Sequence, residues 1–136
     1  MLTSRRTMLL TMTATVLAIS HGPLSAAPRA ASPVAMFDTD NDGTLDLMEV
    51  KKAASAAFAK LDRDHDGTLD RRELAGRLSA KELAAADPDH DGTLTLDEYL
   101  AVVEQRFKAA DPDAEGTLDA KELKSKAGRA VLRLLK

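Results

Sequence analysis

One acidic phrase of twelve residues occurs four times in this chain of 136 residues, and this repetition constrains the fold more than any other feature. The copies start at Asp38, Asp62, Asp87 and Asp111. Each has carboxylates at positions 1, 3 and 5, Gly at 6, Thr at 7, Leu at 8 and Glu at 12. The spacing matches D-x-[DN]-x-[DN]-G-x5-E, with Glu115 as one relaxed position in the last copy.

This pattern is that of EF-hand loops, in which side chains at positions 1, 3 and 5 point to one centre. Glycine at 6 permits a sharp turn, the backbone carbonyl at 7 faces inward, and Glu at 12 returns with both oxygens. Leu at position 8 is expected to form a short strand bridge to a neighbouring loop. The predicted metal ligands are Asp38, Asp40, Asp42, Thr44, Asp46 and Glu49 in loop 1; Asp62, Asp64, Asp66, Thr68, Asp70 and Glu73 in loop 2; Asp87, Asp89, Asp91, Thr93, Thr95 and Glu98 in loop 3; and Asp111, Asp113, Glu115, Thr117, Asp119 and Glu122 in loop 4.

The distribution of acidic residues supports cation binding. Of the 22 acidic residues, only Glu82 and Glu104 lie outside the four loops, so each loop holds five. Solvated helix faces would instead scatter acids among basic partners. Carboxylates packed so closely repel one another unless a cation lies between them. The sequence therefore predicts up to four bound ions, either Ca²⁺ or lanthanide(III).

The loops are not equivalent. Thr95 at position 9 of loop 3 is expected to reach its ion through water. In loop 4, Glu115 adds a methylene at position 5 and Ala114 replaces the Asn or His found at position 4, which predicts the weakest site. His65 and His90 occupy position 4, where the backbone tends toward left-handed conformation that His tolerates. Imidazole is a poor ligand for an oxygen-lined site, so a backbone role is favoured.

Loop spacing predicts an all-α fold. The loops are separated by 12, 13 and 12 residues, which leaves room for one helix rather than the usual two. Val50–Leu61 and Tyr99–Ala110 each predict one helix of about 18 Å. The middle connector, 74–86, contains Gly76 and a capping box of Ser79 and Glu82, which predicts two short helices.

A chain folded at Ser79 places the two long helices antiparallel. Loops 2 and 3 then pair at one end, and loops 1 and 4 pair at the other. The C-terminal stretch 121–136 predicts an amphipathic exit helix of loop 4 with a basic face, for which contact with an anionic membrane is the alternative. The predicted core is Phe58, Leu61, Leu78, Leu83, Val103 and Phe107, with Leu123, Ala127, Val131 and Leu134 on one face of the last helix.

The N-terminal segment has the order of an export signal. Arg5 and Arg6 precede an uncharged stretch and then small residues, which predicts a signal peptide over 1–27, with cleavage after Ser20 or an uncleaved anchor as alternatives. The arginine pair also matches a twin-arginine signal. Residues 28–33 predict a linker, and 34–136 the metal-binding domain, whose first turn starts at Pro33 with Ser32 as its cap. These features predict a periplasmic or secreted protein without a stable membrane anchor.

From Phe37 onward the chain resembles the lanmodulin family, periplasmic lanthanide-binding EF-hand proteins of methylotrophic bacteria. The resemblance is carried by AASAAFAKLD, DPDHDGTL, DEYLAVVEQRFKAADPD and ELKSKAGRAVLRLL, together with the loop spacing. It implies a compact three-helix-like bundle with loops 2 and 3 and loops 1 and 4 paired, in agreement with the spacing. It also implies a preference for lanthanides over calcium and folding on metal binding. The family carries Pro at position 2 of every loop, whereas only Pro88 and Pro112 do so here, and Thr39 and Arg63 depart from it. Thr95 also replaces the acidic residue that the family favours at position 9.

These observations together predict a metal carrier, buffer or sensor. A calcium-stabilised interaction module of the dockerin type, or a calcium sensor, is the alternative, and its partner would be another periplasmic protein. No nucleophile–base constellation occurs, so catalysis is not expected, and neither is a nucleic-acid partner.

Overall fold

The computed structural model describes residues 32–136, so the predicted signal segment 1–27 and most of the predicted linker lie outside the described part. The described elements are α1 (Pro33–Phe37), β1 (Leu45–Asp46), α2 (Leu47–Leu61), β2 (Thr68–Leu69), α3 (Ala80–Ala86), β3 (Leu94–Thr95), α4 (Leu96–Ala110), β4 (Thr117–Leu118), the 3₁₀ helix η1 (Glu122–Lys124) and α5 (Lys126–Leu132). Of these helices, none is long and apolar enough to cross a membrane. The mostly helical architecture confirms the predicted all-α fold.

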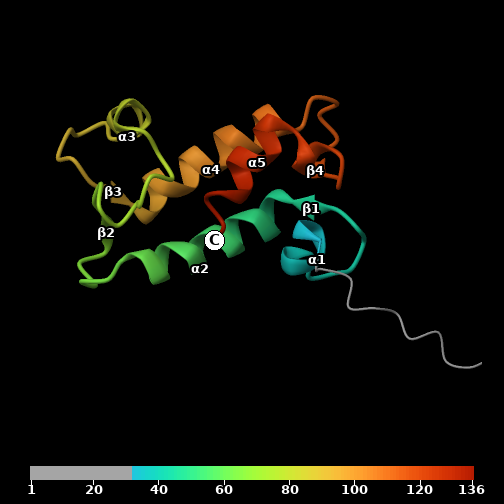
Figure 1. Ribbon diagram of the computed structural model, residues 1–136, viewed down its shortest axis with the longest axis horizontal. Helices are drawn as coiled ribbons and strands as arrows, with labels where there is room; N and C mark the ends of the chain where they lie inside the picture. Colours follow the sequence, from blue (N-terminus) through green and yellow to red (C-terminus); the bar gives the residue numbers. More distant parts are fainter. Residues whose placement is uncertain (1–31) are drawn as a thin grey trace, which may run out of the picture.

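The two long helices α2 and α4 lie side by side in opposite directions, and α5 packs against α4 (Figure 1). At one end β2 pairs with β3, with Leu69 opposite Leu94. At the other end β1 pairs with β4, with Leu45 opposite Leu118. The predicted pairing of loops 2 with 3 and 1 with 4 is therefore confirmed. The long helices α2 and α4 each carry their two loops to opposite ends, and the middle connector turns the chain back, so loops 2 and 3 meet.

Both long helices begin three residues earlier than predicted. Asp46 and Thr95, at loop position 9, cap α2 and α4 through their side chains. The position-12 glutamates Glu49 and Glu98 return to the backbone N–H of the cap residue, which completes a capping box in each loop. The last three residues of loops 1 and 3 are therefore also the first residues of α2 and α4.

The middle connector differs from the prediction of two short helices. Its second half is α3, with the predicted Ser79–Glu82 capping box. Its first half, after Asp70, is a turn, because Ala75 and Gly76 adopt φ values of +47° and +77° and interrupt helical geometry.

The C-terminal stretch is also divided, where a single helix was predicted. Ser125 leaves helical geometry after η1, and its hydroxyl accepts a hydrogen bond from the Gly128 N–H at 3.0 Å, which starts α5. Gly128 packs so closely on η1 that an added Cβ would lie 2.1 Å from the carbonyl oxygen of Glu122. The break turns α5 back onto α4, and Leu123, Val131 and Leu134 remain buried as predicted.

The core fills the space between α2, α4 and α5. Its centre is Tyr99, which is fully buried and meets Phe58 edge-to-face at 5.8 Å between ring centroids. The strand leucines are also fully buried, so each loop pair is anchored to the same core. All the residues predicted for the core of the long helices and the middle connector are buried: Phe58, Leu61, Leu78, Leu83, Val103 and Phe107.

Candidate metal centres

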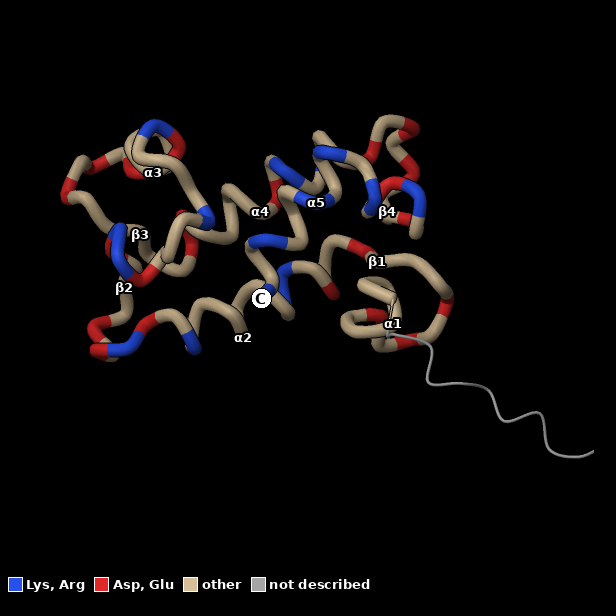
Figure 2. Tube along the Cα trace, viewed as in Figure 1, with Lys and Arg blue, Asp and Glu red and all other residues tan. Residues whose placement is uncertain are grey.

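The acidic residues gather in the loops at the two ends of the bundle, whereas basic residues lie both on the helices and beside the loops (Figure 2). In every loop, three carboxylates offer oxygens that all lie within 4.8 Å of one another. These convergent groups are Asp38, Asp40 and Glu49; Asp62, Asp64 and Asp66; Asp87, Asp89 and Asp91; and Asp111, Asp113 and Glu122. The structure therefore brings the predicted ligands at positions 1 and 3 together in all four loops.

The paired loops share a further property at position 12. In loops 1 and 4, the carboxylates of Glu49 and Glu122 belong to the convergent group. In loops 2 and 3, Glu73 and Glu98 stand outside it, and the position-5 aspartate takes part instead. At the end formed by loops 1 and 4, the position-12 carboxylate therefore lies with the aspartates of positions 1 and 3. At the end formed by loops 2 and 3, it is not part of the convergent group.

Position 1 is held by the glycine turn. In each loop the second carboxylate oxygen of the first aspartate accepts the N–H of the position-6 glycine, for example Gly92 to Asp87 at 2.8 Å and Gly43 to Asp38 at 3.0 Å. The glycines adopt φ between +85° and +90°, which side chains with a Cβ rarely reach. The turn therefore aims the first aspartate inward before any ion is considered.

Position 4 is left-handed in all four loops. The φ values are +60° for Asn41, +59° for His65, +58° for His90 and +57° for Ala114. Both imidazoles are on exposed residues. The prediction of left-handed backbone at this position is confirmed, and Ala114 occupies it without the tolerance of Asn or His.

Position 5 separates loop 4 from the others. In loops 1 to 3 the position-5 aspartate accepts both the N–H and the hydroxyl of the position-7 threonine, at 2.7 to 2.8 Å. Within the described part of the chain, no such bond joins Glu115 to Thr117. The Glu115 N–H donates to Asp113, as the position-5 N–H does to the position-3 aspartate in the other loops, and it also donates to Asp111. The longer side chain therefore does not reproduce the orientation of the other three.

Position 9 serves the helix start. The side chains of Asp46, Asp70 and Asp119 accept the backbone N–H of the glutamate three residues later at 2.7 to 2.8 Å, and Thr95 does so at 3.3 Å. These side chains were predicted as ligands, and the structure gives them a capping contact in addition.

Neighbouring carboxylates in the loops raise the pKa of some of the aspartates. For Asp89, a shared hydrogen bond with the Asp87 carboxyl is the main cause that raises its pKa, and nearby carboxylates add to it. For Asp40, the N–H of Asp42 lowers the pKa, but partial desolvation and the charges of Asp42 and Glu49 raise it more. Protonation relieves part of this repulsion, and a cation at the same place would relieve more.

Three buried carboxylate oxygens have no hydrogen-bond donor among the described residues. They are Asp62 Oδ1, Asp87 Oδ1 and Glu122 Oε1. Asp87 is only 3% exposed and Asp62 only 9%, so these charges are withdrawn from water as well. A buried ionised oxygen without a partner is strongly unfavourable. Together with an all-oxygen donor set, this fits hard cations such as Ca²⁺ or lanthanide(III).

One functional contact was missed by sequence reasoning. In loops 1 and 2, the backbone N–H at position 2 donates to the position-12 glutamate, from Thr39 to Glu49 at 2.5 Å and from Arg63 to Glu73 at 2.9 Å. The absence of Pro at these two positions was the available signal, because only a non-proline residue has this N–H.

Comparisons with known proteins agree with this geometry. The EF hand family model matches residues 35–53 and 55–75, which include loops 1 and 2. Lanmodulin from Methylorubrum extorquens is 52% identical over 69 residues, which is 46% of this chain. The chain spans about half the length of that relative, 52% of it.

Four acidic loops with a glycine turn, paired by short strands and joined by helices, give this chain the arrangement expected of an EF-hand metal-binding protein. Its first two loops match the EF hand family model, and 46% of the chain is similar to lanmodulin.

Proposed function

We propose that this protein binds up to four lanthanide(III) or calcium ions, one in each loop, and folds as it does so. The observation that carries the proposal is the pair of buried, unpartnered oxygens Asp62 Oδ1 and Asp87 Oδ1. They occupy the same position in two loops that pair through β2 and β3. Asp62 and Asp87 each belong to a convergent aspartate group, so a cation in each group would supply the missing partner.

The choice between the two ions follows from charge. Both ions are hard and take oxygen ligands, but a lanthanide carries one more charge, and Coulomb energy scales with that charge. Loops 1 and 2 each have four aspartates and one glutamate at ligand positions. Such a site rewards a trivalent ion over a divalent one. The similarity to lanmodulin, whose name refers to lanthanides, supports the same preference.

Loop 4 is proposed as the weakest site. Glu115 lacks the threonine hydrogen bonds that orient Asp42, Asp66 and Asp91 in the other three loops. An ion in loop 4 would therefore have to reorient this side chain on binding.

Binding and folding are expected to be one process. The chain from residue 28 onward has 17 basic and 22 acidic residues, for a net charge of −5. Without ions, the repulsion in the loops opposes closure, and a core with one Tyr and three Phe gives little compensation. Four trivalent ions would bring the net charge to +7, and four divalent ions to +3. The free energy of ion binding then becomes free energy of folding.

A carrier, buffer or sensor of the periplasm is the role proposed for this chain. The location rests on the export-signal pattern over 1–27, and the twin-arginine route would carry the protein out already folded. No catalytic step is part of the proposal.

A metal-stabilised interaction module is the second candidate. The observation that favours it is the basic outer face of α5, where Lys126, Arg129, Arg133 and Lys136 are exposed around a shallow hollow. Within residues 32–136, none of these four side chains forms an ion pair with a carboxylate. In this role the ions would hold the surface in shape for an acidic protein partner.

The decisive experiment is a titration of chelator-treated protein with Ca²⁺ and with La³⁺, followed by circular dichroism and by calorimetry. We expect a gain of helicity, saturation near four ions, and tighter binding of La³⁺. Retained helicity in chelator together with no heat of binding would overturn the proposal. A pull-down with metal-loaded and metal-free protein separates the carrier from the module, since only the module retains a partner dependent on metal.

A further inference from the structure

We propose that basic side chains of the C-terminal segment and of the middle connector form a docking site for an acidic peptide segment of a partner protein, and that bound ions switch this site on. The inference rests on the proposed function, and it gives the second candidate a defined site and a mode of regulation. The six side chains, named the basic track, line two adjoining hollows: Arg71, Arg77, Lys126, Arg129, Arg133 and Lys136.

The hollow beside the connector gathers arginines from three separate segments. Arg71 belongs to loop 2, Arg77 to the turn before α3, and Arg133 follows the end of α5. The cavity has a volume of about 460 Å³, and Arg133 also lines the neighbouring hollow of about 480 Å³ along α5. A guanidinium offers parallel N–H groups that match the two oxygens of a carboxylate. The arrangement therefore suits an extended ligand with several carboxylates.

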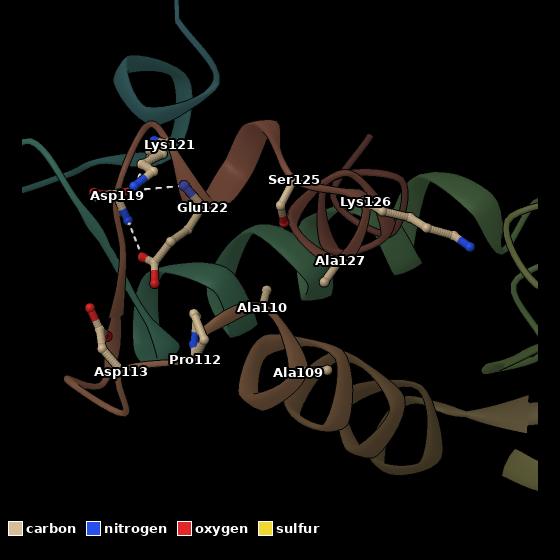
Figure 3. A pocket seen from close by; sticks show the side chains of 10 residues that line it. All are labelled: Ala109, Ala110, Pro112, Asp113, Asp119, Lys121, Glu122, Ser125, Lys126 and Ala127. Atoms are coloured by element: carbon tan, nitrogen blue, oxygen red, sulfur yellow. Dashed lines mark hydrogen bonds between the residues drawn. The ribbon is translucent and has the colours of Figure 1, made fainter.

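The charge of the basic track is not neutralised from within the bundle. Within residues 32–136, none of its six side chains forms an ion pair with a carboxylate. Glu82 also lines the connector hollow, but it is paired with Arg106 at 2.8 Å, and its second oxygen accepts the Ser79 N–H at 2.8 Å. Figure 3 shows the Lys126 side chain extending away from Glu122 of loop 4. The track is therefore available to an anion from outside.

The composition of the two hollows favours a peptide over a membrane surface. A basic face that binds lipid usually adds apolar side chains that enter the acyl boundary. The leucines that line these hollows, Leu78 and Leu132, are buried in the core. Among the described residues, the exposed large apolar side chains line neither hollow: Met36, Met48 and Leu96. Charge and concave shape remain as the means of recognition, and both suit carboxylate side chains.

The two hollows adjoin only when the bundle is folded. Arg77 Nε donates to the carbonyl oxygen of Lys136 at 3.0 Å, which holds the chain after loop 4 against the connector after loop 2. Arg106 Nη1 donates to the carbonyl oxygen of Ala130 at 2.9 Å, which joins α4 to α5. Since folding is proposed to require ions, the complete track exists only in the ion-loaded protein.

Bound ions also change the sign of the charge that an acidic partner meets. Without ions, residues 28–136 have a net charge of −5, and Arg71 lies among the five carboxylates of loop 2. Four divalent ions would bring this charge to +3, and four trivalent ions to +7. Attraction between exposed charges acts over about 10 Å at 0.1 M salt, so the loops next to the track affect its potential. Ion loading therefore both assembles the site and removes the repulsion.

The test measures binding of a fluorescein-labelled oligoglutamate peptide by anisotropy, with protein saturated with La³⁺ and with protein in chelator. Arg129→Gln combined with Arg133→Gln removes two charges of the track. Lys52→Gln combined with Lys60→Gln is the matched control, because it removes two charges from exposed positions of α2 that line neither hollow. Arg71→Gln tests the other side of the connector hollow and decides the question if the α5 pair does not fold.

We expect the La³⁺-loaded parent to bind the peptide and the protein in chelator to bind none. The paired arginine substitutions should raise the peptide dissociation constant by at least about tenfold, and Arg71→Gln should also raise it. The paired lysine substitutions should change it by less than about twofold, because salt screens distant charges. The amide NMR signal of Gly76, which lines the connector hollow, should shift on peptide addition, whereas those of the four loop glycines should not.

Three results would overturn the inference. Equal weakening by the arginine and lysine pairs would show attraction without a site, and shifts confined to the loop glycines would show that the peptide binds the ions. Binding of the La³⁺-loaded protein to phosphatidylglycerol vesicles but not to the peptide would identify a membrane surface instead. Equal peptide binding with and without La³⁺ would contradict the switch. If the parent takes up no La³⁺, the proposed function itself fails, so the two failures are distinguishable.

Discussion

The hydroxyl of Tyr99 donates a 2.7 Å hydrogen bond to the carbonyl oxygen of Leu134, across 35 residues and inside the core. Tyr99 follows the last glutamate of loop 3, and Leu134 lies in the segment that follows loop 4. Burial raises the pKa of Tyr99 to about 12, so the hydroxyl remains a donor at all ordinary pH values. The contact connects the loop pair at one end of the bundle to the chain that leaves the pair at the other end.

Tyr99→Phe should therefore destabilise the metal-loaded protein without removing an ion site. The substitution leaves the Leu134 carbonyl buried without its donor, which costs about 1–3 kcal/mol. Urea unfolding in excess La³⁺, followed by circular dichroism, measures this loss. The number of ions bound should stay the same as in the parent. An unchanged unfolding midpoint would show that water replaces the hydroxyl.

Gly128→Ala should disrupt loop 4 selectively. The new Cβ would lie 2.1 Å from the carbonyl oxygen of Glu122, so α5 must move away from η1. Glu122 is the position-12 residue of loop 4, and its displacement should reduce the number of tightly bound ions by one. Calorimetric titration gives this number. Arg129→Ala, an exposed neighbour in the same helix, is the control and should bind as the parent does.

Glu115→Asp should strengthen loop 4. The shorter carboxylate at position 5 can accept the N–H and hydroxyl of Thr117, as Asp91 does from Thr93 in loop 3. We expect the weakest ion-binding step of the parent to tighten by about threefold to tenfold, which corresponds to the typical net contribution of one intramolecular hydrogen bond, about 1 kcal/mol. Site-resolved titration with La³⁺ measures it. Equal affinities in the variant and the parent would show that position 5 does not limit this loop.

Glu104 should contribute to stability in a defined pH range. Hydrogen bonds and charge attraction from Lys108, and then from Lys51, lower the pKa of Glu104 from 4.5 to about 2. Because the folded pKa is lower than the unfolded one, the stabilisation is present above pH 4.5 and is lost as the pH falls through about 2.

The matched variant is Glu104→Gln, which removes the charge and keeps the shape. The difference in unfolding midpoint between parent and variant should be constant near pH 7 and shrink toward zero between pH 4.5 and about 2. Taking the difference cancels the protonation of the loop carboxylates, which both proteins share. A difference that persists unchanged at pH 2 would exclude the proposed ion pair as its cause.

Much of the fold was predictable because the repeat has a fixed length. Twelve residues between loops 1 and 2 and between loops 3 and 4 allow one helix, which carries its two loops to opposite ends. The middle connector folds back at Ser79, so loops 2 and 3 meet and the pairing of Leu69 with Leu94 follows. The left-handed backbone at Asn41 and His65 was also predictable, because it is set by their position in the repeated loop. Local patterns of this kind need no knowledge of distant contacts.

The errors lie where two segments meet. A continuous helix over 121–136 was predicted because its apolar spacing fits one, but the close packing of Gly128 on Glu122 divides it at Ser125. The first half of the connector 74–86 was expected to be helical, yet Ala75 and Gly76 adopt positive φ values and form a turn between loops 2 and 3.

The sequence by itself determined the four acidic loops, their spacing and thus their pairing, because ligand positions and helix length are properties of short stretches. Only the tertiary structure decided which carboxylate oxygens are buried without a donor and which accept an N–H. Asp87 Oδ1 and Glu49 Oε1 are the same chemical group, and they differ in burial and neighbours, which are fixed only when the helices pack.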